Sequence, residues 1–405
     1  MQPGGGVVNR AGRCVVVGAG RIGCGFIAER MLKAGLDVTL VTRTVEKAEA
    51  LNRDGGVWVR MLTRAGVRDQ FVGPLQAVPA DDARTVSRHI AESCLVAVCV
   101  GSSQLPDVAP IIAPGLAEHR EPVNVLVANN QADAGSRMRE LVAAHTPGSV
   151  ERHGYAGVLV NRIVTAQKDG PGAPPRFVAE ARIAAAVEAR SLRAALPRVA
   201  GLRPVGNYSA HVQRKLYVFS AGHAAAAYLG ALRGHRLLPQ AVADPEVRAV
   251  VLAAMAEGQA GLAGRYGRAF AGGPSRRLAE LARFRQVALG DTVDRVGRDP
   301  LRKLGVEDRI LGPALLAASA GIPPVSLAVV AAAALQFGSD NPMLSRRLRR
   351  HGVPDVLERY AGVPSSSAFA RLVDRAFTLL DETRPITGTR AALATDLDET
   401  PLLAS

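Results

Sequence analysis

Residues 13–23 read RCVVVGAGRIG, an apolar run that passes directly into a glycine-rich turn. The run from Arg13 to Val17 has the continuous apolar pattern of a buried strand, and a helix-like segment follows the turn as far as Lys33. Residues 38–41 form a second predicted strand. The turn therefore has the GxGxxG spacing, between a strand and a helix, that binds the pyrophosphate of a dinucleotide.

Each glycine of this turn has a predicted role. Gly18 makes the tight turn, Gly20 lets the backbone approach the pyrophosphate, and Gly23 allows close packing of the helix. Arg21 and Ile22 lie at the helix N-terminus, which faces the negative charge. We expect these five residues to bind the cofactor; the alternative is a glycine turn without a ligand.

The end of the second strand distinguishes NAD from NADP. An acidic residue there would bind the ribose 2′-hydroxyl of NAD. This chain has Thr42 and Arg43 instead, and a hydroxyl with a guanidinium can hold a 2′-phosphate. The sequence therefore predicts that NADP(H) is preferred over NAD(H). The alternative is that Arg43 stacks on the adenine and discriminates little.

Two further predicted strands end in small polar residues. Residues 95–100 are followed by Gly101 and Ser102. Residues 123–128 lead to Asn130. Ligands lie at the carboxyl ends of such strands, so Gly101 and Ser102 are expected on the nicotinamide side and Asn130 near the reacting carbon. An amide there can donate a hydrogen bond to a developing alkoxide; a plain turn is the alternative.

One segment of the second half places a lysine, a hydroxyl and a histidine on an apolar background. It reads KLYVFSAGH, from Lys215 through Ser220 to His223. On an α-helix His223 would lie about 80° around from Lys215, and Ser220 one turn below His223. Apolar surroundings lower the pKa of a lysine, so that it can act as a base. The alternative is a surface lysine beside a core histidine.

Composition strengthens Lys215 as a candidate. Of the 50 lysines and arginines only five are lysines: Lys33, Lys47, Lys168, Lys215 and Lys303. Arginine does not release its proton at accessible pH, so it cannot serve as a general base. A lysine retained against this bias is therefore a better catalytic candidate than usual.

Positive charge is concentrated in residues 294–303, near a Pro/Gly turn. The candidates for substrate binding there are Arg295, Arg298, Arg302 and Lys303. Together they can hold a phosphate or several sugar hydroxyls. A solvated basic turn is the alternative.

Bulk composition argues against several classes of binding partner. The net charge is +14, but arginines are spread along the chain and aromatic residues make up only 4%, so we expect no nucleic-acid partner. The longest apolar run, residues 325–337, is too short to span a bilayer, so no membrane partner is expected either. No paired Cys/His spacing suggests a metal. The cysteines, Cys14, Cys24, Cys94 and Cys99, are expected to be buried free thiols of a cytoplasmic protein.

The 405 residues are enough for two domains. We expect an α/β Rossmann-type domain with a mostly parallel, doubly wound sheet over residues 13–206, and an all-α substrate domain over residues 207–385. Residues 1–12 and 386–405 are expected to be flexible tails.

Other elements are predicted from local patterns. A strand is expected over residues 157–163 and a loop over the proline-rich residues 170–175. Helices are expected over residues 208–232, 245–266, 275–288, 313–320, 324–337 and 366–381.

With these residues in place, the chain resembles the polyol-specific long-chain dehydrogenases, and most closely the mannitol-1-phosphate 5-dehydrogenases. The likeness extends over about residues 13–340. It rests on residues 18–27, 161–164, 213–216, 222–224, 227–230, 294–303 and 308–313, and on the strand ending at Gly101.

The resemblance implies zinc-independent hydride transfer between a polyol and its ketose. The family's catalytic lysine corresponds to Lys215 as general base, and its histidine to His223, which positions the substrate. A catalytic asparagine corresponds to Asn130. The substrate-binding arginine and lysine correspond to Arg295 and Lys303.

The chain also departs from the family pattern. The motif asparagine between the lysine and the histidine is Ser220, which we still expect in the catalytic group. The aspartate of the D-R-I-V-P segment is Asn161; Asn161 and Arg162 are expected to contact the substrate. The aspartate usual after the second strand is Thr42. The exact substrate and the NAD preference usual in the family therefore stay open.

Three functions are compatible with these residues. The first is an NADP-dependent reductase of an anionic, phosphorylated ketose, with fructose 6-phosphate and mannitol 1-phosphate as the reference pair, acting as a monomer or homodimer. The second is a reductase of another sugar- or cyclitol-like ketone in a specialised pathway. The third is a nucleotide-sensing protein without turnover, against which the pair Lys215 and His223 argues.

Overall fold

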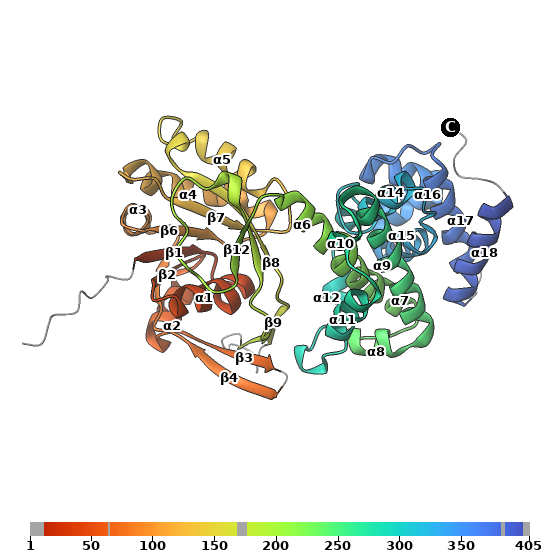
Figure 1. Cartoon of the computed structure of the whole chain (residues 1–405), viewed down its shortest axis with the longest axis horizontal. Coiled ribbons are helices and arrows are strands. Elements are labelled where there is room, and N and C mark those ends of the chain that lie inside the picture. Colours follow the sequence, from red (N-terminus) through yellow and green to blue (C-terminus); the bar gives the residue numbers. More distant parts are fainter. Residues whose placement is uncertain (1–11, 64, 168–175, 382–384, 400–405) are drawn as a thin grey trace, which may run out of the picture. The chain divides into compact units, whose positions relative to one another are not determined.

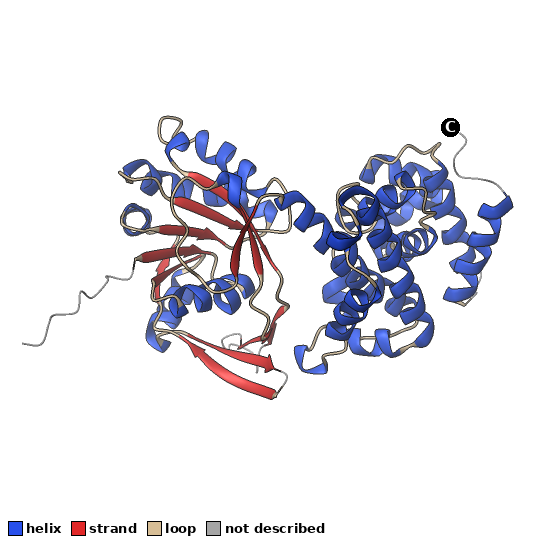
Figure 2. Ribbon diagram, in the orientation of Figure 1, coloured by secondary structure: helices blue, strands red, loops and turns tan. Residues whose placement is uncertain are grey.

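The computed structural model describes residues 12–63, 65–167, 176–381 and 385–399. Contacts divide the chain into two compact units, residues 1–212 and 213–405. The division falls within α6, a few residues after the expected boundary. Figure 2 shows that the strands of the described residues lie in the first unit and that the second unit is built from helices.

The first unit is organised around an eight-stranded sheet with the order β12-β11-β8-β7-β6-β1-β2-β5. From β5 to β8 every neighbouring pair is parallel; β11 then runs antiparallel to β8. This confirms the expected doubly wound sheet. The strands are β1 (Arg13–Val17), β2 (Asp37–Thr42), β5 (Gln76–Pro79), β6 (Leu95–Val98), β7 (Asn124–Ala128), β8 (Gly154–Val160), β11 (Ala185–Glu188) and β12 (Leu202–Val205).

Helices cover both faces of this sheet (Figure 1). Alternation along β1 explains why: Cys14 and Val16 belong to one apolar cluster, and Val15 and Val17 to another. The first cluster packs under η1 (Gly23–Ala28), α1 (Glu29–Lys33) and α2 (Val45–Asp54). The second packs under α3 (Ala83–Ala91), α4 (Leu105–Glu118) and α5 (Ala134–Ala143).

A second sheet, with the order β4-β3-β10-β9, was not predicted. Its strands are β3 (Val57–Thr63), β4 (Gly66–Val72), β9 (Val164–Gln167) and β10 (Arg176–Glu180). The strand predicted over residues 157–163 ends at Val160, and the chain then crosses into the second sheet at Val164. The loop predicted over residues 170–175 lies outside the described residues.

The second unit is helical. Its elements are α6 (Tyr208–Arg214), η5 (Lys215–Ser220), α7 (Ala221–Leu232), α8 (Leu238–Ala243), α9 (Pro245–Tyr266), α10 (Arg268–Ala271), α11 (Pro274–Phe284), α12 (Val293–Gly297), α13 (Pro300–Lys303), α14 (Leu311–Ser319), α15 (Val325–Gly338), α16 (Pro342–Ala361), α17 (Ala368–Asp381) and α18 (Ile386–Glu399). The start of α9 is as predicted, because the Asp244 carboxylate caps it by accepting from the backbone N–H groups of Glu246 and Val247. No helix of the described residues is long and apolar enough to cross a bilayer.

The expected flexible tail from residue 386 onward is wrong for most of its length, because Ile386–Glu399 forms α18. Ile386, Thr389 and Leu393 are buried there. Arg390 Nε donates to Ser326 Oγ at 2.9 Å. The helix is therefore held by tertiary contacts that a weakly patterned sequence does not reveal.

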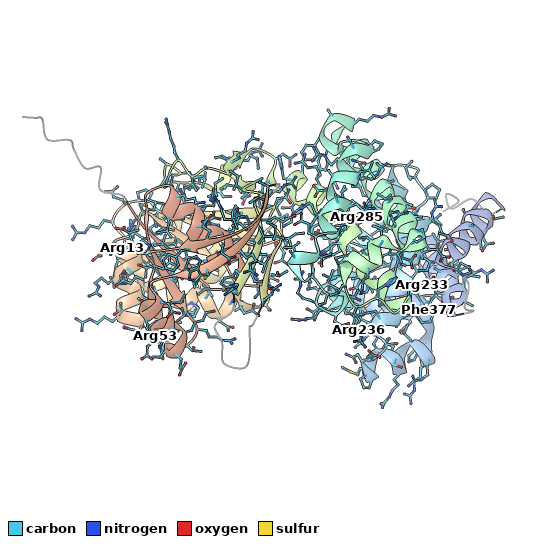
Figure 3. All side chains as sticks on the ribbon, turned by 90° about the horizontal axis from the view of Figure 1, so that it is seen from below. Arg13, Arg53, Arg233, Arg236, Arg285 and Phe377 are labelled. Atoms are coloured by element: carbon cyan, nitrogen blue, oxygen red, sulfur yellow. The ribbon has the colours of Figure 1, made fainter. Side chains whose placement is uncertain are left out.

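The prediction that the cysteines are buried is correct only in part. Cys14 and Cys24 are buried as expected, but Cys99 is only partly buried and Cys94 is exposed, since it lies in a bend just before β6. Arginine side chains extend from both units (Figure 3). Among them, Arg53 and Arg233 are 73% and 47% exposed.

Candidate active site

In the glycine turn after β1, the protein backbone can be approached closely by a ligand. Gly18 has φ +105°, in the region that favours glycine, and a Cβ there would lie 2.8 Å from the Cys99 carbonyl oxygen. A Cβ at Gly23 would lie 2.0 Å from the Gly18 carbonyl oxygen. A Cβ at Gly20 would meet no atom within 4 Å. The turn is thus closed to side chains on its inner side and open at Gly20, which fits a pyrophosphate.

Other predicted residues follow the neighbouring strands. Gly101 and Ser102 come after β6, and Asn130 comes after β7. Asn161 comes after β8 and donates its backbone N–H to the Ala184 carbonyl. Because β1, β6, β7 and β8 are adjacent and parallel, these residues share one edge of the sheet with the glycine turn.

The end of β2 differs from the prediction in detail. Thr42 is buried, and its hydroxyl donates to the Thr44 carbonyl at 2.8 Å. Arg43 is exposed. Lys47 Nζ, three residues into α2, donates to the Ala19 carbonyl within the glycine turn at 2.7 Å. Two cations, Arg43 and Lys47, therefore stand where one was predicted, and the scarcity of lysine was the signal that could have identified Lys47.

Arg162, predicted to bind the substrate, has no exposed side-chain surface. Its Nη1 donates to the Gly25 carbonyl at 2.8 Å and to Glu29 Oε2 at 2.5 Å. Its guanidinium also lies 5.0 Å from the centroid of the Phe26 ring. These contacts hold η1 and α1 behind the glycine turn, so Arg162 has a structural role in the first unit.

In the second unit, Lys215 and Ser220 begin and end the π-helical turn η5. The uniform α-helix predicted over this segment is therefore wrong at the place where the candidate residues lie. A π-turn is wider than an α-turn, so the angle of about 80° between Lys215 and His223 does not apply. Ser220 is buried, at 4% exposure.

The charge of Lys215 is destabilised by its surroundings. Burial lowers the pKa of Lys215 to about 7, and the nearby charges of Arg309 and Arg283 act in the same direction. Glu280 opposes them. A lysine with this pKa is neutral in a large fraction of molecules at neutral pH, as a general base requires.

His223 lies in the first turn of α7 and clusters with two aromatic rings. Its ring is nearly parallel to Phe219 and Phe284, with centroids 5.6 and 4.9 Å away. Its Nε2 lies 3.1 Å from Oδ2 of Asp291, a buried carboxylate. Burial lowers the pKa of His223, and Asp291 opposes that shift.

Asp291 also binds one of the predicted substrate residues. Arg295 Nε donates to Asp291 Oδ1 at 2.7 Å. The structure thus brings His223 and Arg295 together through a carboxylate that sequence reasoning missed. The available signal was weak: an aspartate four residues before an arginine at the start of a short helix.

The rest of the basic segment is divided between buried and exposed cations. Lys303 is buried, with Nζ 5.9 Å from the centroid of the Tyr228 ring, and burial lowers its pKa to about 7, helped by the charges of Arg309 and Arg302. Arg302 is half exposed and pairs with Asp308 at 2.9 Å. Arg298 is exposed.

Arg309 was not predicted as a site residue. It shares the Asp308 carboxylate, with its Nε 2.7 Å from Oδ1. Its charge acts on both Lys215 and Lys303. Among the residues that the structure describes, no group of three His, Cys, Asp or Glu side chains could hold a metal ion.

Comparisons with known proteins cover both units. Residues 12–201 match the family model of the mannitol dehydrogenase Rossmann domain, and residues 207–357 match that of the mannitol dehydrogenase C-terminal domain. The fold is similar to Pseudomonas fluorescens mannitol 2-dehydrogenase in a ternary complex with NAD and D-mannitol, at 15% identity and a TM-score of 0.75, covering 96% of this chain and 95% of that one.

A second similar structure is D-sorbitol dehydrogenase in a substrate-free form, at 14% identity and a TM-score of 0.68, covering 96% of this chain and 93% of that one. At these identities the likeness establishes the fold.

Proposed function

The chain belongs to the mannitol dehydrogenase family, and on this premise we propose that it interconverts a phosphorylated polyol and its ketose with Lys215 as general base. The observation that carries the proposal is the lowered pKa of Lys215, about 7, which follows from its burial and from the nearby cations Arg309 and Arg283. A base that titrates near neutral pH is what proton removal from an alcohol needs.

In the oxidation direction Lys215 takes the proton of the alcohol, and the product is the ketone. Nicotinamide, when bound, supplies the hydride chemistry. His223 orients the substrate, and Asn130 donates a hydrogen bond to the oxygen as its charge changes. Ser220 provides a hydroxyl where the family pattern has an amide.

The preference for a phosphorylated substrate is supported by charge. Arg295 pairs with Asp291, Arg302 and Arg309 share Asp308, and Lys303 lies near Arg302 and Arg309. A phosphate can use donors of this kind. Asn161 and Arg298 stay proposed substrate contacts.

The preference for NADP(H) is supported by Arg43 and Lys47, since two cations beside the glycine turn suit a 2′-phosphate. Thr42 contributes indirectly, because its hydroxyl donates to the Thr44 carbonyl and so stabilises the turn after β2. The other proposed cofactor contacts are Gly18, Gly20, Arg21, Ile22, Gly23, Gly101 and Ser102.

A second candidate keeps the chemistry and changes the substrate to another sugar- or cyclitol-like ketone. It is favoured by Ser220 and Asn161, where the family pattern has other residues.

The first experiment measures oxidation of NADPH, and separately NADH, by the purified protein with fructose 6-phosphate. Fructose is the control substrate, and the Lys215→Ala variant is the control protein. Turnover only with the phosphorylated sugar supports the proposal. Tight NADPH binding without turnover of either sugar favours the second candidate, and turnover by Lys215→Ala contradicts the assignment of the base.

A further inference from the structure

The carboxylate of Asp291 has a separate partner for each oxygen. Oδ2 lies 3.1 Å from His223 Nε2. Oδ1 accepts from Arg295 Nε at 2.7 Å and lies 2.5 Å from Arg295 Nη2 in an ion pair. Asp291 is only 4% exposed, so water does not compete freely for either oxygen.

We propose that Asp291 is a positioning residue that keeps the hydrogen of His223 on Nε2, so that Nδ1 accepts a hydrogen bond from a substrate hydroxyl next to the one that reacts. The part of this inference that concerns the substrate rests on the proposed function. The part that concerns the histidine tautomer rests on the protein alone.

The tautomer follows from the chemistry of the pair. An ionised carboxylate can only accept a hydrogen bond, so the hydrogen between Asp291 and His223 must be carried by Nε2. Arg295 favours the ionised form of Asp291, and the pKa of Asp291 is lowered by His223 and Arg295 against the effect of burial. A neutral imidazole has one N–H group, which leaves Nδ1 as an acceptor.

The ring has little freedom to change this arrangement. Phe219 and Phe284 both pack against it, with interplanar angles of 26° and 28°, and the centroids of these two rings lie 5.3 Å from each other. Among the described residues no hydrogen bond to Nδ1 is present, and the side chain is 14% exposed. Nδ1 is therefore the ring nitrogen that is available to a bound ligand.

The substrate requirement follows from counting hydrogens. The reacting hydroxyl has one hydrogen, and Lys215 takes it in the proposed reaction. In the reverse direction the carbonyl has none. An acceptor at Nδ1 therefore binds a hydroxyl other than the reacting one, and with that hydroxyl on the next carbon, as proposed, the substrate is a vicinal diol or the matching α-hydroxyketone.

Asp291→Asn tests the tautomer sharply because Arg295 fixes the orientation of the new amide. The amide oxygen must face the guanidinium, which places the NH2 group against His223 Nε2. That nitrogen must then accept, so the hydrogen of His223 moves to Nδ1.

The measurement is nitrogen-15 NMR of the full-length protein labelled at histidine, with His223→Asn used to identify the His223 signals. We expect the Nε2–H tautomer in the unaltered protein and the Nδ1–H tautomer in Asp291→Asn. Asp244→Asn is the matched control, because Asp244 Oδ2 lies 3.2 Å from His235 Nε2 in an equivalent pair. It should leave the His223 signals unchanged.

An Nδ1–H or doubly protonated His223 in the unaltered protein at pH 8 would overturn the inference, even if Asp291→Asn failed to fold. An unchanged tautomer in a folded Asp291→Asn protein would overturn it as well.

Steady-state kinetics test the part of the proposal that concerns the substrate. With the unaltered enzyme, one of the two ketoses 1-deoxyfructose 6-phosphate and 3-deoxyfructose 6-phosphate should have a kcat/KM lower than that of fructose 6-phosphate by about 100-fold. In Asp291→Asn this discrimination should shrink to less than about 5-fold, while the NADPH Kd stays unchanged. Equal discrimination in both proteins contradicts the proposal. If no ketose is turned over at all, the proposed function fails, and the tautomer is still decided by NMR.

Discussion

Lys215 is a buried lysine whose charge depends on its neighbours in the second unit. Burial and the cations Arg309 and Arg283 favour its neutral form, while Glu280 favours its charged form. Because the pKa of Lys215 is about 7, small changes in these neighbours strongly alter the fraction of Lys215 that is neutral at neutral pH.

This predicts opposite pH dependences for the two directions of the reaction. Neutral Lys215 accepts the alcohol proton, so kcat/KM for polyol oxidation should rise as pH increases through about 7. Protonated Lys215 donates in reduction, so kcat/KM for ketose reduction should fall over the same range. Profiles from pH 5 to 9 measure both, with Lys215→Arg as the control that keeps the charge and removes the base; it should lose at least about 1000-fold in kcat. Rising profiles in both directions would refute the assignment.

At Arg43 the prediction concerns cofactor choice. Arg43→Asp replaces a cation with an anion, so it should weaken NADPH binding by about 10- to 100-fold and change NADH binding much less. Fluorescence titration of each cofactor needs no sugar substrate. Arg53→Asp, at the other end of α2 and 73% exposed, is the matched control. Equal weakening of both cofactors would show that Arg43 does not contact the 2′-phosphate.

At the scale of elements, the two motif segments share one feature. The helix after the glycine turn begins with the π-turn η1, and Lys215 begins the π-turn η5. Such turns break the uniform spacing of side chains and often occur at functional sites. In the second unit, α9 supports η5 closely: a Cβ at Gly258 would lie 2.2 Å from the Tyr217 carbonyl oxygen.

Gly258→Ala should therefore move η5 away from α9. We expect a loss of about 1–3 kcal/mol in the free energy of unfolding, because backbone and not a flexible side chain opposes the new methyl group. Urea unfolding measures it. Gly264→Ala on the same helix is the control, since its Cβ would meet only the Ala320 Cβ at 3.1 Å and alanine favours the helix. Equal stabilities of the two variants would contradict the close contact.

At the scale of the whole molecule, the second unit is completed by its last described helix. The Ile386 N–H donates to Glu246 Oε2 of α9 at 3.1 Å, and Arg390 binds Ser326 of α15. The α18 helix therefore joins helices that are far apart in the sequence.

Ending the chain at residue 385 should lower the midpoint of thermal unfolding, because it exposes the apolar surface under Ile386 and Leu393 and removes these hydrogen bonds. We expect a loss of about 3 kcal/mol or more. Differential scanning calorimetry measures it, with a chain ending at residue 399 as the control. Identical midpoints for the two truncations would mean that α18 adds no stability.

Much of the candidate site followed from local sequence. The GxGxxG turn, the strands before Gly101 and Asn130, and the helix ending at Tyr266 depend on residues close together in the chain, whose spacing and capping determine local structure. Lys215 stood out because its residue type is scarce. These features, with the two-domain organisation, were determined by the sequence by itself.

Other features were decided only by tertiary structure. Asp291 and His223 are 68 residues apart, the Lys47 contact with the glycine turn spans 28, and α18 folds against helices more than 60 residues away. Such contacts depend on how elements pack, and no local period encodes them. The same is true of η5: a π-turn needs neighbours that accept its extra width, and those neighbours come from distant parts of the chain.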